Sequence, residues 1–194
     1  MSTSLRAIFR WVRTGDMPEL EERQITFRFP QGWDVMRYET SYMHTNIMMP
    51  LQNTHAVDFI CCHDGSVMLL EVKRFSERPF ASSGSDLENF INEVCGQFRD
   101  TVCGIAVAKM KACPNFASYH AALFSEEKNT RKITLFLELE NLVAGKRREE
   151  VLADILEKLR KRFSPMGFSV RVVDAATVNS SDKCPWKAEV APCQ

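Results

Sequence analysis

Two short apolar segments joined by Asp-Gly constrain the fold of this chain more than any other feature of its sequence. Residues 56–62 and 67–73 are rich in Val, Ile, Leu, Phe and Cys, which is typical of β-strands. Asp64 and Gly65 lie between them, and this dipeptide favours the two-residue type I′ turn of a β-hairpin. The sequence therefore predicts a tight hairpin.

The turn also determines which residues of the two strands face each other. If the loop consists of Asp64 and Gly65, Asp58 lies directly opposite Glu71. Lys73 follows Glu71 by two residues, so its side chain emerges on the same face. Two opposed carboxylates repel each other, and the pair needs a compensating charge. Lys73 supplies part of it, and a Mg²⁺ ion, which prefers oxygen ligands, would supply more.

A polar or ion-paired surface patch explains the same residues without any ligand, and both interpretations stay open at this point. A three-residue loop would shift the register and place the carboxylates on opposite faces. The second face of the hairpin is expected to pack into a core. Its residues are Val57, Phe59, Cys61, Met68, Leu70 and Val72.

An Asp, a turn and then Glu-x-Lys at the end of an apolar strand resembles the PD-(D/E)xK nuclease superfamily. Val57-Asp58 and Glu71-Val72-Lys73 carry the resemblance, with Val57 in place of the proline, and it covers roughly residues 25 to 110. It implies a restriction-endonuclease-like α/β core, with helices on both faces of a mixed central sheet. It also implies a Mg²⁺-dependent endonuclease that hydrolyses phosphodiester bonds, with DNA favoured over RNA by analogy alone.

The resemblance assigns roles to four residues of the hairpin. Asp58, Glu71 and the backbone carbonyl of Val72 would hold Mg²⁺, for which Mn²⁺ is expected to substitute. Lys73 would orient the attacking water or stabilise charge in the transition state.

Residues outside the hairpin are candidates for the same site. Gln97, on the flank of a helix after the Glu-x-Lys strand, corresponds to a residue that can approach the scissile phosphate, although an ordinary helix-boundary Gln fits equally. Glu39 is a candidate for a further acidic ligand, with a surface Glu as the alternative. Arg74 and Arg78, in the segment after Lys73, are candidates for phosphate contacts or for a solvated loop.

Periodicity and capping signals predict the remaining elements. Ser85 to Glu88 is a capping box that begins a long helix, which reaches about Lys111. The stretch 33–44 is either a strand or a short helix, and 43–54 is expected to be a loop. The other expected elements are helix 4–13, strand 24–29, a short helix within 114–131, strand 132–140, helix 146–163 and strand 168–174. This order is typical of an α/β domain.

Composition narrows the class of protein. The chain has 194 residues and zero formal net charge, so any nucleic-acid contact must be local or shared with a homodimer or other protein partner. Seven cysteines without a CxxC pair indicate reduced thiols and a cytoplasmic protein. No apolar run approaches the roughly 20 residues of a membrane span. We expect one nuclease-like domain over 1–178 and a flexible tail over 179–194.

One alternative function belongs to a different class. The same scaffold could be a catalytically inactive module that binds nucleic acid or a protein partner, with Asp58, Glu71 and Lys73 as an ion cluster. A requirement for a divalent cation discriminates between the two, since such a module would not need one.

Overall fold

The hairpin around Asp64 and Gly65 forms the centre of the molecule. The structure is a computed structural model that describes residues 17–51, 54–76, 80, 84–127, 130–140, 147–182 and 184–192. Strand β4 (Phe59–His63) pairs antiparallel with β5 (Ser66–Phe75), in a register that aligns His63 with Ser66. Asp64 and Gly65 have φ of +47° and +67°, the left-handed values of a type I′ turn. The predicted turn is thus confirmed, and the predicted register holds over Phe59–His63, whereas Asp58 precedes the paired residues of β4.

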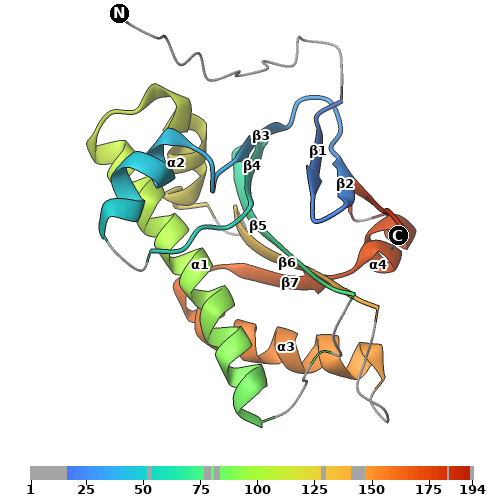
Figure 1. The fold of residues 1–194 in the computed structure, drawn as a ribbon. Helices are drawn as coiled ribbons and strands as arrows, with labels where there is room; N and C mark the ends of the chain where they lie inside the picture. The colour runs from blue at the N-terminus through green and yellow to red at the C-terminus, as the bar shows by residue number, and fades with distance from the viewer. Residues whose placement is uncertain are drawn as a thin grey trace, which may run out of the picture.

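The hairpin belongs to a mixed five-stranded sheet of order β3-β4-β5-β6-β7 (Figure 1). Strand β3 (Asp34–Arg37) pairs antiparallel with β4, whereas β6 (Arg131–Leu139) and β7 (Ser169–Val173) extend the sheet in parallel. Parallel strands need a long crossover connection, and a helix lies in each one. These helices are α1 (Gly84–Met110), between β5 and β6, and α3 (Arg148–Phe163), between β6 and β7.

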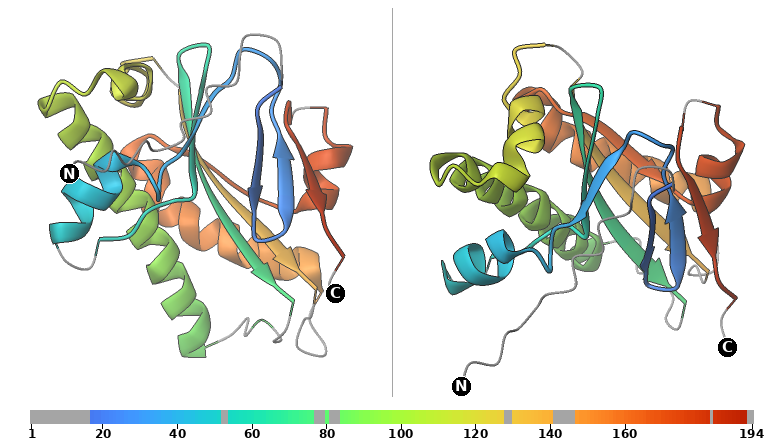
Figure 2. Two further views of the ribbon diagram at one scale, coloured as in Figure 1. Left: turned by 45° about the horizontal axis from the view of Figure 1, so that its top comes forward. Right: turned by 90° about the horizontal axis from the view of Figure 1, so that it is seen from above.

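Helices α1, α2 (Ala117–Leu123) and α3 cover one face of this sheet (Figures 1 and 2). Helix α1 begins at Gly84, one residue before the predicted start, and its apolar stripe is buried except for Val102, which is half-buried. The 3-10 turn η3 (Pro114–Phe116) leads into α2. Val57, expected on the opposite face, also packs here, because it precedes β4 and donates its N–H to Thr101 of α1 at 3.1 Å.

A second sheet covers the opposite face, where helices were expected. Its strands are β1 (Glu19–Glu22), β2 (Ile25–Arg28) and β8 (Lys187–Val190), all antiparallel, and the short helix α4 (Ala175–Ser180) lies beside them (Figure 1). The buried residues between the layers come from both sheets and α4. They include Phe27, Phe59, Cys61, Met68, Leu70, Val72, Phe136, Val178 and Trp186. The fold is therefore α/β, with helices on one face and chiefly a sheet on the other.

Two local predictions were wrong. The segment 179–194 was expected to be a flexible tail, but β8 pairs with β2, and Trp186 is buried against Phe27 and Phe29. The loop expected over 43–54 contains a π-helical turn, η1 (Met43–Met48), and a 3-10 turn, η2 (Met49–Leu51). The predicted helix 4–13 lies outside the described residues. No helix in the described part of the chain has the length and apolarity that a membrane span requires.

Candidate metal centre

Asp58 immediately precedes β4, which begins at Phe59. Its carboxylate accepts a hydrogen bond from the backbone N–H of Val72 on β5 at 2.7 Å. The side chain thus satisfies a donor of the central strand where β4 no longer runs beside it. Only 4% of Asp58 is exposed, so this bond holds a buried carboxylate in a defined orientation.

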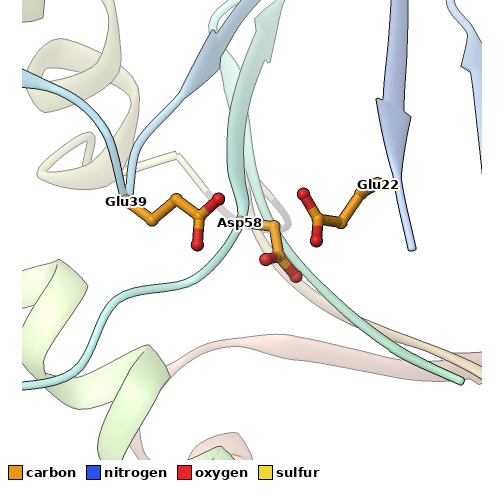
Figure 3. A group of neighbouring side chains, drawn as sticks. All are labelled: Glu22, Glu39 and Asp58. Carbon is orange, nitrogen blue, oxygen red and sulfur yellow. The ribbon is translucent and has the colours of Figure 1, made fainter.

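Two further carboxylates converge on Asp58. Glu22 comes from the end of β1, and Glu39 from the turn after β3 (Figure 3). One oxygen from each of the three side chains lies within 4.8 Å of the others. Burial raises the pKa of Asp58 to about 6, and the negative charges of Glu22 and Glu39 add to the rise. The structure thus brings Glu39 to the predicted site, and it adds Glu22, which the sequence analysis missed.

Glu71 lies on the helix-covered face of β5 and is only 1% exposed. Its Oε1 accepts hydrogen bonds from Gln97 Nε2 at 2.7 Å and lies 3.0 Å from Lys73 Nζ. Its Oε2 is buried and has no hydrogen-bond partner. Burial raises the pKa of Glu71 to about 8, and the charge of Asp58 contributes, while Lys73 opposes the rise.

Lys73 points toward carboxylates and not into the apolar layer. Its Nζ lies 3.0 Å from Glu71 and donates to Glu93 of α1 at 2.7 Å. Burial opposes the charge of Lys73, but these two carboxylates hold its pKa above the ordinary value. Glu93 and Gln97 are four residues apart on α1, so both reach the same face of the sheet. Gln97 was predicted at this place; the sequence analysis missed Glu93, although its i, i+4 spacing to Gln97 was a usable signal.

Arg74 does not behave as the predicted phosphate contact. Its guanidinium donates to Glu140 at 2.7 Å, to Gln24 Oε1 at 3.0 Å and to the carbonyl of Ala191 at 2.8 Å. These bonds tie the end of β5 to the second sheet and to the segment after β8, so the role of Arg74 is structural. Arg78 lies outside the described residues.

The donor set fits a hard divalent cation. A buried carboxylate oxygen without a partner is costly unless the group is protonated or binds a cation. Glu71 Oε2 is such an oxygen, and Asp58 lies close enough to raise the pKa of Glu71. Asp58, Glu22 and Glu39 form a group that does not include Glu71, and their oxygens are ligands of the kind that Mg²⁺ and Mn²⁺ prefer.

Some of the negative charge is already balanced within the protein. Arg37 donates to Glu22 and lies 3.3 Å from Glu39, and its guanidinium stacks over the ring of Phe59. Such contacts are typical of a structural ion cluster. Searches among protein-family models, characterised proteins and solved structures find no match for the chain.

Proposed function

We propose that the chain is a divalent-cation-dependent nuclease with a restriction-endonuclease-like core. The observation that carries the proposal is Glu71 Oε2, which is buried and has no partner, while the charge of a second buried carboxylate, Asp58, raises the pKa of Glu71. Supporting it are the antiparallel strands β3 to β5 followed by a helix and a parallel strand, with the acidic residues on the central hairpin. The resemblance of Val57-Asp58 and Glu71-Val72-Lys73 to the PD-(D/E)xK superfamily points the same way.

In this proposal Asp58, Glu71 and the carbonyl of Val72 would hold Mg²⁺ or Mn²⁺. When bound, the ion would withdraw charge from a phosphodiester group and help to ionise water. Gln97 acts as a positioning residue, because its amide holds Glu71 Oε1 at 2.7 Å. Glu39 and Glu22 hold further negative charge beside Asp58 and would strengthen cation binding.

Lys73 would supply a positive charge at the reacting phosphate. Its neighbours Glu71 and Glu93 raise the pKa of Lys73, so the ammonium can stabilise negative charge that develops on the phosphate oxygens. Loss of one such group typically lowers the rate by about 10²–10³. Lys73→Met is therefore expected to abolish most cleavage while leaving Asp58 and Glu71 in place.

The proposed substrate follows from analogy with the nuclease superfamily, and composition bears on affinity and cellular location. DNA is the proposed polymer. Zero net charge predicts a modest intrinsic affinity for DNA, so a second copy of the chain or a protein partner would be needed for tighter binding. The described cysteines are all free, and three of them, Cys61, Cys62 and Cys184, are buried, which is in keeping with the proposed cytoplasmic location.

The test is cleavage of end-labelled duplex and single-stranded DNA in Mg²⁺, Mn²⁺ or EDTA. Wild type is compared with Asp58→Asn and Lys73→Met, and with two matched surface controls on α3, Asp154→Asn and Lys161→Met. We expect cation-dependent cutting that both site variants lose and both controls keep. Cleavage that persists in Asp58→Asn would refute the assignment.

The alternative is an inactive module in which the acidic residues form a structural ion cluster. The ion pairs of Arg37 with Glu22 and Glu39 and of Lys73 with Glu93 are the observations in its favour. Thermal unfolding with and without Mn²⁺ separates the two functions. An inactive ion cluster predicts an unchanged midpoint, together with no cutting by any variant.

A further inference from the structure

A basic cavity lies on the helix-covered face of the five-stranded sheet, away from the candidate metal centre. It has a volume of about 440 Å³, within the range of small-molecule sites, and its lining residues come from the end of α3 and the turn after it and from the starts of β6 and β7. Arg131 and Arg160 line it together with Ser164 and Ser169, and Phe168 and Val170 are its apolar lining residues. These described lining residues include no Asp or Glu.

The two arginines have no anionic partner in the described part of the chain. The other basic residues of α3 differ: Lys158 and Arg162 pair with Glu88, and Lys161 pairs with Glu157. Arg148, at the start of the helix, is likewise paired. Arg160 takes part in no ion pair with a described carboxylate, and neither does Arg131.

Arg131 is also incompletely satisfied as a hydrogen-bond donor. Its Nε is buried and has no partner, which is costly for a charged group. The guanidinium lies close to Gly167, where an added Cβ would come within 3.0 Å of Nη2. Gly167 has a φ of +80° and ends the helical turn after α3, so a residue without a side chain leaves room for Arg131.

We propose that this cavity binds the phosphate group of a phosphorylated ligand. A guanidinium recognises phosphate through paired charge-assisted hydrogen bonds, and two of them in one cavity repel each other until an anion lies between them. The hydroxyls of Ser164 and Ser169 offer further donors, while Phe168 and Val170 would contact the organic part of the ligand. The C-terminal dipole of α3 opposes an anion, but with roughly half a charge against two full charges.

The cavity is independent of the proposed metal centre. Arg131 precedes Leu135, the register partner of Glu71, by four residues, which corresponds to roughly 13 Å along the strand. The phosphate could belong to a free nucleotide or to the 5′ end of a nucleic acid. Asp58→Asn should leave binding intact in either case, so the two proposals can fail separately.

Isothermal titration in EDTA would test the site, with AMP and adenosine as the first pair of probes. We expect saturable binding of AMP and none of adenosine. Arg160→Gln, which changes an exposed residue, and Arg131→Gln should each weaken AMP binding by about tenfold or more. Lys161→Gln removes the same charge from the same helix and should change binding by less than about twofold, because this side chain lies outside the cavity.

Oligothymidylates with and without a 5′ phosphate distinguish the two sources of phosphate. Tighter binding of the 5′-phosphorylated oligomer than of AMP would assign the site to a nucleic-acid end, and equal binding would assign it to a free nucleotide. The proposal would be overturned if AMP did not bind saturably, or if adenosine bound as tightly as AMP. It would also be overturned if both arginine variants kept the thermal stability and the AMP affinity of wild type, or if Lys161→Gln weakened AMP binding as much as they do.

Discussion

Replacing Glu71 by Gln should make the protein more resistant to alkaline pH in the absence of divalent cations. Glu71 is 1% exposed, and burial raises its pKa from an ordinary 4.5 to about 8. A group with a raised pKa stabilises the folded state fully below its unfolded pKa, and this contribution is lost as the pH rises through the folded value. Gln keeps the shape of the neutral side chain and can still accept from Gln97 and Lys73, so its contribution should not depend on pH.

The expected size follows from the proton that the folded protein holds at Glu71. Where the folded state binds one proton that the unfolded chain has released, the free energy of unfolding falls by about 1.4 kcal/mol for each pH unit. With a folded pKa of about 8, wild type should lose roughly 2 kcal/mol between pH 6 and pH 8 that the variant does not lose. For a chain of this length that difference corresponds to roughly 4–8 °C in the unfolding midpoint.

Thermal and urea unfolding at half-unit steps from pH 5.5 to 8.5 in EDTA would measure the difference. Glu150→Gln, an exposed change on α3, serves as the control and should follow wild type. Adding Mn²⁺ should raise the midpoint of wild type and flatten its pH dependence, since a cation replaces the proton, but should not affect Glu71→Gln. Parallel curves for wild type and Glu71→Gln in EDTA would show that the reasoning about the buried carboxylate is wrong.

Two further predictions concern packing. A Cβ at Gly104 would lie 1.8 Å from the hydroxyl of Tyr38, so Gly104→Ala should lower the free energy of unfolding by about 1–3 kcal/mol. That hydroxyl is buried without a partner, so Tyr38→Phe should cost little and should restore part of the loss in the double variant. Additive free energies of urea unfolding for the two substitutions would contradict the contact. Trp186→Ala should lower the free energy of unfolding by about 3–5 kcal/mol, because Trp186 packs against Phe27 and Phe29 at ring distances of 5.9 and 6.0 Å. A loss below about 1 kcal/mol in urea unfolding would mean that the segment around Trp186 contributes little to stability.

The hairpin could be predicted because its determinants are local. Asp64 and Gly65 fix the turn by backbone preference, and the turn fixes the register of β4 on β5. Helix α1 could be predicted for the same reason, since the signal for its start and its apolar stripe lie within one segment. The second sheet could not be predicted from local sequence signals. Strand β8 pairs with β2 across most of the chain, and its four residues carry too little alternation to reveal a partner.

The residues of the candidate site likewise fall into those that local sequence predicts and one that depends on distant packing. Asp58, Glu71 and Lys73 follow from one turn, whereas Glu22 reaches Asp58 only because the second sheet carries the end of β1 to the edge of the hairpin. The failure to predict the second sheet and the failure to predict Glu22 therefore have a single cause. If β1 is what brings Glu22 to Asp58, the acidic cluster depends on packing between the sheets, and a substitution such as Trp186→Ala should weaken Mn²⁺ binding without touching a ligand. The proposed metal centre would then be a property of the joined layers and not of the hairpin motif alone.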